Sequence, residues 1–226
     1  KAIIRDEYRY QCINIRYPQK HSKIPCLKPF IQLEFIETEI FDEILEQSIT
    51  SLAAEAYKEK AEVKAIQCSS ILSTQAEKLI SMLRRTASAF RDSNREEDPT
   101  LIRHIYDTYY IQTMGKADVS KLFPLVEKVI VQDKDRFGSQ HPRFVDEPVS
   151  ELRFALQLLE EDSKFEKQFD EYVAPMVYGG KVVTWEKAFS VFKETVNAVL
   201  FEIEKPNSIS IATTHFFINT PKSIDD

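Results

Sequence analysis

The chain has 226 residues, a formal net charge of −6 and 43% hydrophobic residues, which is the profile of a globular protein long enough to bury a core. Four glycines nearly exclude a glycine-rich phosphate loop, and the negative charge confines any nucleic-acid binding to a local basic patch. The three cysteines lack disulfide-like or metal-binding spacing and no apolar run is long enough to span a membrane, so we expect a protein of the reducing cytoplasm.

The first part of the chain has the alternating pattern of a small sheet. It predicts three strands at residues 2–17, 29–37 and 62–70, and a short helix at residues 40–51. The first strand needs a bulge near Gln11, because its alternation changes phase there. The second strand has the clearest alternation, with Ile31 and Leu33 on one face. We expect these two strands to pair in the antiparallel sense.

From Thr74 onward the apolar spacing changes to that of amphipathic helices. Thr74 and Glu77 form a capping box at the start of the first helix. Asp98 followed by Pro99 is typical of the start of the second. Four further helices are predicted to start at Asp118, Glu151, Ser163 and Thr184, with a loop over residues 138–148 between the first two of them.

Strands followed by helices indicate an α+β fold, with a small antiparallel or mixed sheet and a helical bundle. We expect residues 1–72 to form the sheet layer and residues 73–202 to form the helical domain. Residues 203–226 are rich in serine and threonine and are predicted to be a hairpin or a disordered tail.

Two charged residues stand at positions where chemistry is conceivable. Glu34 lies mid-strand on the face opposite Leu33, and it is either an exposed strand carboxylate or a metal-ligating or base carboxylate in a cleft. Lys78 lies on the flank of its helix stripe, where a lysine ordinarily extends into water. Arg85 follows two turns later on the same flank, so the two cations could instead face one anion such as a phosphate.

The next helix carries a second charged pair. Arg103 and Asp107 are spaced four residues apart, which is typical of a surface ion pair but also places them together beside the apolar stripe. His104 falls roughly opposite that stripe, and we expect it to be exposed and without a role. The four histidines all lie in predicted loops or exposed positions, so no nucleophilic catalytic set is predicted.

Two apparent motifs are rejected. The run Asp133-Lys134-Asp135 resembles a metal-binding Asp-x-Asp, but residues two apart in a helix diverge and cannot converge on one ion. Gly138-Ser139 followed by Asp146 resembles the start of a nucleotidyltransferase signature, but it lies between helices without the strand that such a signature needs.

Several short stretches, taken in order, resemble one family. They are Leu27-Lys-Pro-Phe-Ile-Gln-Leu-Glu34, Thr74-Gln-Ala-Glu77-Lys78-Leu79 with Arg84-Arg85, Arg103-His104-Ile-Tyr106-Asp107, Val129-Ile-Val-Gln-Asp-Lys134 with Arg136-Phe137, and an aromatic pattern from Phe169 to Phe189. Over roughly residues 1–200 the chain resembles the downstream two-thirds of the AbiEii/AbiGii toxin family. These are nucleotidyltransferases of the polymerase β-like superfamily, which implies that the sheet is part of a nucleotidyltransferase domain.

The resemblance implies transfer of a nucleoside monophosphate from an NTP to an acceptor such as tRNA. Such enzymes hold Mg²⁺ with carboxylates and contact the triphosphate with a lysine, and a toxin of this kind implies an antitoxin as partner. The resemblance makes Glu34, Lys78 and Asp107 the catalytic residues, with Glu34 also the metal ligand. It places four cations around the nucleotide, which are Lys78, Arg85, Arg103 and Lys134.

One departure from the family pattern concerns its opening signature. Gly-Ser followed by Asp-x-Asp on adjacent strands is absent, and it would precede Lys1. We therefore expect the chain to be the C-terminal portion of a nucleotidyltransferase and to be inactive in nucleotidyl transfer by itself. The alternative is a non-catalytic helical module that binds another protein.

Overall fold

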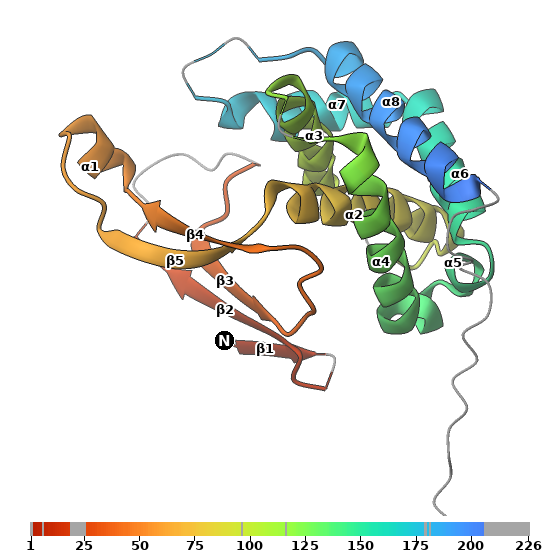
Figure 1. Cartoon of the computed structure of the whole chain (residues 1–226), viewed down its shortest axis with the longest axis horizontal. Helices are drawn as coiled ribbons and strands as arrows, with labels where there is room; N and C mark the ends of the chain where they lie inside the picture. The colour runs from red at the N-terminus through yellow and green to blue at the C-terminus, as the bar shows by residue number, and fades with distance from the viewer. Residues whose placement is uncertain are drawn as a thin grey trace, which may run out of the picture.

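The chain folds as an α+β protein in which the strands come first and the helices follow (Figure 1). The computed structural model describes residues 2–5, 7–18, 26–95, 97–115, 117–178, 180 and 182–205. The strands are β1 (Ala2–Arg5), β2 (Tyr10–Arg16), β3 (Phe30–Ile36), β4 (Ile44–Ile49) and β5 (Val63–Ser69). The α-helices are α1 (Leu52–Ala56), α2 (Ile71–Arg91), α3 (Arg103–Thr113), α4 (Val119–Phe137), α5 (Pro142–Asp146), α6 (Pro148–Glu161), α7 (Lys164–Tyr172) and α8 (Trp185–Glu204).

The predicted fold class is confirmed by this arrangement. Figure 1 shows the strands gathered on one side of the molecule and the larger helices packed together on the other. Helix α8 continues to Glu204, so the helical part reaches beyond residue 202. The predicted tail from residue 206 to 226 lies outside the described residues. None of the described helices is long and apolar enough to cross a membrane.

The strands form two antiparallel sheets, one of β1, β2 and β3 and one of β4 and β5. The antiparallel pairing of β2 with β3 is confirmed, with Cys12 opposite Glu34. The single long strand predicted over residues 2–17 is wrong, because the chain reverses between β1 and β2. Glu7 and Tyr8 have φ values of 51° and 73°, a left-handed conformation that turns the backbone back on itself. The predicted bulge near Gln11 is also wrong, because β2 pairs with β3 without a register shift from Tyr10 to Arg16.

The helix predicted at residues 40–51 is also wrong. Residues Ile44 to Ile49 form β4, whose backbone pairs with β5 and shifts register between Gln47 and Ile49. Ile40, Ile44 and Leu45 show helical spacing, but the stretch is short and the distant pairing with β5 decides its structure, which is the usual limit of local propensity. The strand predicted at residues 62–70 is confirmed as β5.

Helix α2 begins earlier than predicted. Ser70 is its N-cap, and the Ser70 hydroxyl accepts a hydrogen bond from the backbone N–H of Ser73 at 3.0 Å. The capping box at Thr74 and Glu77 is therefore wrong, because a serine four residues upstream already satisfies the first turn. The predicted caps Asp98, Asp118 and Thr184 are confirmed. Asp98 starts a 3-10 turn (Pro99–Ile102) that leads directly into α3.

Two of the predicted boundaries between later helices change. The loop expected at residues 138–148 contains a 3-10 turn (Gly138–Gln140) and the short helix α5. The helix predicted to start at Ser163 ends at Tyr172. A second 3-10 turn (Ala174–Met176) follows it, because Pro175 has no backbone N–H to continue an α-helix. This turn bears on the candidate site, since its residues cover one side of α3.

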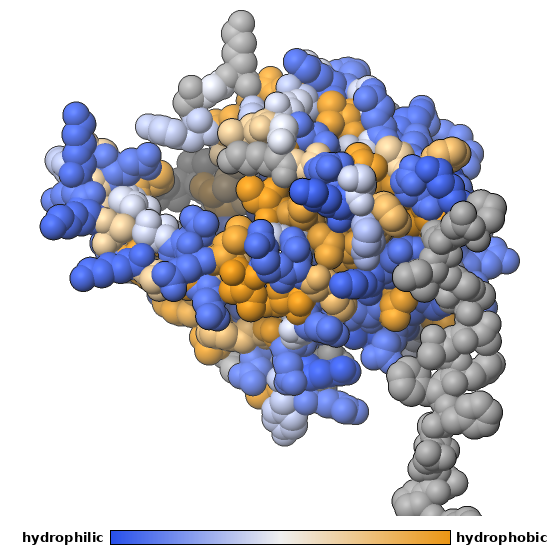
Figure 2. Space-filling view, in the orientation of Figure 1, coloured by the Kyte–Doolittle hydropathy of each residue, from blue (hydrophilic) through white to orange (hydrophobic). Residues whose placement is uncertain are grey.

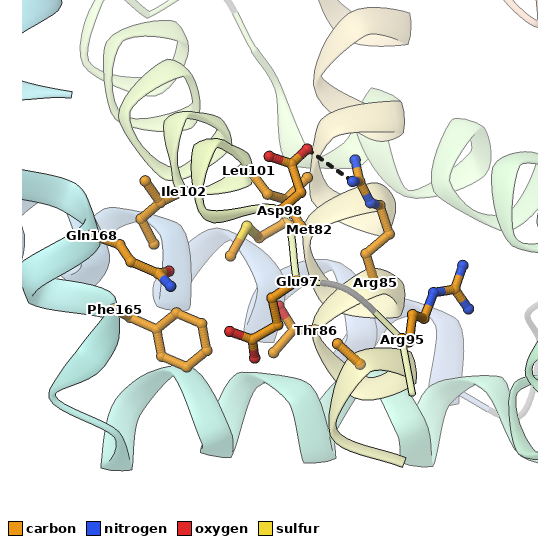
Figure 3. Close-up of a pocket in the computed structure, with 11 residues that line it drawn as sticks. Met82, Arg85, Thr86, Arg95, Glu97, Asp98, Leu101, Ile102, Phe165 and Gln168 are labelled. Atoms are coloured by element: carbon orange, nitrogen blue, oxygen red, sulfur yellow. Dashed lines mark hydrogen bonds and ion pairs between the residues drawn. The ribbon is translucent and has the colours of Figure 1, made fainter. Parts of the chain in front are cut away.

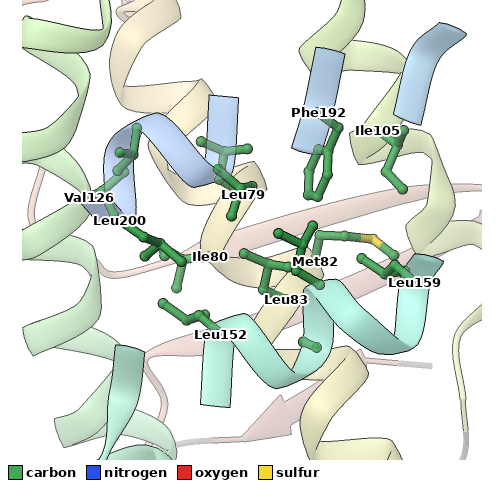
Figure 4. Close-up of a cluster of buried hydrophobic side chains, with 14 of the residues drawn as sticks. Leu79, Ile80, Met82, Leu83, Ile105, Val126, Leu152, Leu159, Phe192 and Leu200 are labelled. Carbon is green, nitrogen blue, oxygen red and sulfur yellow. The ribbon is translucent and has the colours of Figure 1, made fainter. Parts of the chain in front are cut away.

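The core lies among the helices rather than in the sheets. Helix α2 packs against α3, α4 and α6, and α8 packs against α3 and α4. The apolar face of α2 is buried: Leu79, Met82 and Leu83 are at most 2% exposed and Thr86 is 8% exposed. Figure 4 shows Leu79, Met82 and Leu83 among side chains from the neighbouring helices, including Phe192 of α8.

The three-stranded sheet leaves one apolar face open to solvent. The register aligns Ile13 with Leu33 and Ile15 with Ile31, so these four side chains share a face. They are between 40% and 55% exposed, as is the neighbouring Phe35. Figure 2 shows apolar residues at the surface over the strands. The sheets are thus joined to the helical part mainly by the connecting segments of the chain and by contacts at their edges. One of these contacts is the hydrogen bond from Thr38 to Gln132.

The contrast between buried and exposed positions on α8 gives a stability prediction. Phe192 is fully buried and Phe201 is 61% exposed on the same helix. Phe192→Ala should lower the free energy of unfolding by about 3–5 kcal/mol, because it leaves a cavity in the core. Phe201→Ala should change it by less than about 1 kcal/mol. Urea denaturation followed by circular dichroism measures both, and equal losses would contradict the location of the core.

Candidate functional site

Lys78 and Asp107 meet across two neighbouring helices. The Lys78 Nζ atom on α2 lies 2.7 Å from Asp107 Oδ2 on α3. Their side chains are 27% and 35% exposed, so this ion pair lies at the surface rather than in the core. Lys78 directly precedes the buried Leu79 in α2. The packing of Leu79 therefore fixes the position from which the Lys78 side chain projects. The structure therefore brings together two of the three residues predicted to be catalytic.

The ion pair borders a hollow of about 360 Å³, which we call the Lys78 hollow. Lys78, Arg103, His104 and Asp107 supply its polar wall, and Tyr106 joins that wall from α3. The rest of its lining is apolar and comes from the segment after α7, with the side chains Val173, Met176 and Val177. A hollow of this size with charged and apolar lining residues can take a small molecule that has an anionic part and an apolar part.

Arg103 leaves its positive charge available in this hollow. Its Nε donates to the backbone carbonyl of Thr100 at 3.0 Å, and its Nη2 donates to the Thr100 hydroxyl at 3.3 Å. These bonds orient the guanidinium without neutralising it, and no carboxylate of the described residues pairs with it. Two cations and one carboxylate therefore surround the hollow, which favours an anionic ligand.

His104 was predicted to be exposed and without a role, and the predicted exposure is wrong. The side chain is partly buried and lines the Lys78 hollow. Burial lowers the pKa of His104, and the charges of Lys78, Arg85 and Arg103 act in the same direction while Asp107 opposes them; together they bring this pKa to about 4. The wheel of α3 alone could not show this, because several residues that line the hollow come from distant parts of the chain, including Val173 and Met176.

Arg85 faces a second hollow of about 220 Å³ (Figure 3). Its Nη2 lies 2.9 Å from Asp98 Oδ2. Burial alone would raise the pKa of Asp98, but hydrogen bonds from Thr100 and the charge of Arg85 together lower it. Figure 3 shows Arg95 beside this pair and Phe165 on the far side of the hollow. Lys78 and Arg85 thus line different hollows, each with its own carboxylate.

Glu34 and Lys134 line neither hollow. Glu34 is exposed on β3, where it accepts hydrogen bonds from the Tyr10 hydroxyl at 3.0 Å and from the Gln32 side chain. Burial and the bond to Glu34 raise the pKa of Tyr10 to about 12. Lys134 lies near the end of α4, next to Asp133.

The described residues do not gather a complete metal site. They contain no group of three or more His, Cys, Asp and Glu side chains placed to hold an ion. Glu34 already accepts two hydrogen bonds from neighbours on its own sheet, and Asp107 is paired with Lys78. A magnesium ion needs several oxygen ligands in near-octahedral geometry, so these residues could supply at most part of its shell.

Two further ionic clusters were missed by the sequence analysis and are structural. Arg84 Nε lies 2.6 Å from Asp133 Oδ2 in the interior, while Asp135 is exposed; the two aspartates diverge, which agrees with the rejection of a metal motif. His141 is 3% exposed, although it was placed among the exposed or loop histidines, and its Nε2 lies 2.9 Å from Glu151. Burial opposes ionisation of Glu151, but hydrogen bonds from Arg91 and His141 lower its pKa.

The fold and the hollow together define a class: an α+β protein with a strand layer, a helical bundle and a cationic site at the bundle surface. The comparison with protein families is more specific. The family described as nucleotidyl transferase AbiEii toxin, type IV TA (toxin–antitoxin) system, matches residues 1–192. The chain belongs to this family, and the predicted resemblance is confirmed. No curated protein and no solved structure gives a significant match.

The environment of His104 gives a prediction of pH-dependent stability. Its folded pKa of about 4 lies below its ordinary value of 6.5, so below pH 6.5 the unfolded chain binds a proton that the folded chain does not. The free energy of unfolding should therefore fall as pH falls from about 6.5 to about 4, by on the order of 1–2 kcal/mol from this residue. In the His104→Gln variant, the free energy of unfolding should lack this part of its pH dependence.

The measurement compares urea denaturation of the two proteins at about pH 7 and about pH 4.5. The buried His141 is present in both, so its titration cancels in the comparison. The variant should gain stability relative to the unmodified chain at the lower pH. A difference between the two proteins that does not change with pH would contradict the burial of His104.

Proposed function

We propose that this chain binds an NTP in the Lys78 hollow and takes part in transferring its nucleoside monophosphate to an RNA acceptor such as tRNA. One observation supports the proposal most strongly. In a chain of a nucleotidyl transferase family, Lys78, Arg103 and Asp107 come from two helices to line the same hollow. Membership in a toxin family also implies an antitoxin as partner.

The polar wall suits the triphosphate. Lysine and arginine N–H groups form short, charge-assisted hydrogen bonds with phosphate oxygens. Asp107 holds the Lys78 ammonium in place and Thr100 holds the Arg103 guanidinium. Both cations are thus oriented before a ligand arrives, which lowers the entropic cost of binding.

The apolar wall suits the rest of the nucleotide. Val173, Met176 and Val177 line the hollow together with the cations, and Tyr106 adds an aromatic ring. A nucleobase is flat and largely apolar on its faces, so it can pack against aromatic and aliphatic side chains. We therefore place the phosphates toward Lys78 and the base toward Met176.

In the proposed reaction the acceptor hydroxyl oxygen forms a bond to the α-phosphorus. The bond between that phosphorus and the bridging oxygen breaks, and pyrophosphate leaves with the electron pair. The hydroxyl proton passes to a carboxylate, for which we assign Asp107. Its Oδ2 binds Lys78, while Oδ1 has no hydrogen-bond partner among the described residues, so it can accept a proton.

Glu34, Arg85 and Lys134 have supporting roles in the proposed function. Nucleotidyl transfer generally requires a divalent metal such as Mg²⁺, and Glu34 would add one carboxylate to its shell. Because the described residues gather no complete site, no step is derived through the metal. Arg85 and Lys134 would act as supporting cations along the phosphates or the acceptor, from outside the Lys78 hollow.

A second candidate is a non-catalytic module that binds another protein. The apolar face of the three-stranded sheet, with Ile13, Ile31, Leu33 and Phe35 exposed, favours it, because exposed apolar patches often mark interaction sites. A pull-down that recovers one stoichiometric partner, combined with no shift of melting temperature by any NTP, would favour this candidate over nucleotidyl transfer.

Lys78→Met should weaken binding of the preferred NTP roughly tenfold or more, because charge-assisted hydrogen bonds to the phosphates are lost. Isothermal titration calorimetry with ATP, CTP, GTP and UTP measures the effect. Lys167→Met is the matched control, since Lys167 is exposed on α7 and lines neither hollow. Equal affinities for the two variants would argue against phosphate binding at Lys78.

Asp107→Asn should reduce nucleotidyl transfer by on the order of 100-fold or more, because the proposed proton acceptor is lost. Transfer of radiolabel from each α-labelled NTP to tRNA measures it, with protein produced from the natural reading frame. Asp135→Asn, at an exposed position on α4, should leave the rate unchanged. If the unmodified protein labels no RNA with any NTP, the proposed function is wrong.

A further inference from the structure

We propose that His104 binds the nucleotide directly, as a neutral imidazole that donates a hydrogen bond from Nε2 to a phosphate oxygen in the Lys78 hollow. This inference rests on the proposed function, and it adds a binding residue that the sequence pattern had left without a role. Three observations support it: the position of His104 in the wall of the hollow, the state of its two ring nitrogens, and the charges around it.

The position follows from the sequence of α3. His104 lies directly between Arg103 and Ile105, and Asp107 follows three residues later on the same side of the helix. It lines the Lys78 hollow together with Arg103 and Asp107. A ligand that fills this hollow therefore has the imidazole among the side chains around it.

The two ring nitrogens are in different surroundings. Nδ1 is buried and has no hydrogen-bond partner among the described residues, whereas Nε2 is not among the buried unpaired atoms. A buried N–H without an acceptor is rarer in proteins than a buried lone pair without a donor. The proton of a neutral ring therefore belongs on Nε2, which leaves an N–H donor at the open side of the ring.

The charges around the ring keep it neutral. Lys78 and Arg85 on α2 and Arg103 on α3 disfavour a further positive charge, and only Asp107 opposes them. A neutral ring beside two cations adds a directional donor without adding charge. It can thus align a phosphate oxygen that Lys78 and Arg103 attract, and it does not act as a proton acceptor at neutral pH.

The first test reads the tautomer without a ligand and without activity. Long-range ¹H–¹⁵N spectra of the unmodified chain at about pH 7 distinguish the protonated ring nitrogen from the bare one. The His104 signals are assigned by their absence in His104→Gln. We expect a neutral ring with the proton on Nε2, and a shift of the Nε2 signal when inorganic triphosphate is added. A charged ring, or a proton on Nδ1, would overturn the inference.

The second test uses a matched pair of variants. His104→Gln places an amide donor near the position of Nε2, whereas His104→Met has a similar length and no donor. His104→Met should weaken the binding of inorganic triphosphate and of the preferred NTP by on the order of 3- to 10-fold, which is the loss of one neutral hydrogen bond. His104→Gln should restore most of that affinity.

The combined outcomes separate this inference from the proposed function. If Lys78→Met weakens triphosphate binding and His104→Met does not, the proposed function stands and the role of His104 is wrong. If the unmodified chain binds neither triphosphate nor any NTP, both are wrong. If His104→Gln is as weak as His104→Met, the effect is loss of ring packing, and the hydrogen bond is refuted.

Discussion

Burial of one face of α2 is the constraint on which the rest of the structure depends. Leu79, Met82 and Leu83 are at most 2% exposed and meet side chains from the helices around them. Because α2 packs against α3, α4 and α6 at once, its rotation about its own axis is fixed. Lys78 precedes Leu79, so the packing that buries the leucine also sets where the ammonium emerges. The position of Lys78 in the candidate site therefore depends on the packing of the core.

Two ion pairs made by α2 differ in their exposure to solvent. Arg84 and Asp133 are only 5% and 12% exposed, and removing one partner would leave a largely buried charge. Lys78 and Asp107 are 27% and 35% exposed and border a hollow. Charges in that position contribute little to stability and keep part of their hydrogen-bonding capacity for a ligand.

The features that were predicted correctly from the sequence are those decided by neighbouring residues. Asp98, Asp118 and Thr184 begin helices because their side chains bond the first backbone N–H groups, and this needs no distant partner. Strand β4 was misread because only pairing with β5 reveals it. The capping box at Thr74 was misread because Ser70 caps the helix a turn earlier.

The same distinction applies to the site. Spacing on α3 indicated that Arg103 and Asp107 share a flank, and it could not show that Lys78 of α2 reaches Asp107, although family resemblance pointed to all three. His104 was misjudged because a helical wheel describes one helix, whereas burial depends on what covers it. Here Val173 and Met176, some seventy residues away in the chain, line the same hollow as His104. No local pattern in the sequence carries this information.

The partition of roles in the hollow follows from the donors each side chain has. Lys78 carries three N–H donors and uses one of them in the hydrogen bond to Asp107. A phosphate can therefore bind the ammonium without breaking the ion pair. Arg103 donates hydrogen bonds to Thr100 from Nε and Nη2, and Nη1 takes no part in those bonds. A ligand therefore finds cations that are already oriented and only partly satisfied. Such preorganisation lowers the cost of ordering the site, and it is the physical basis of the proposal that this hollow binds a highly charged nucleotide.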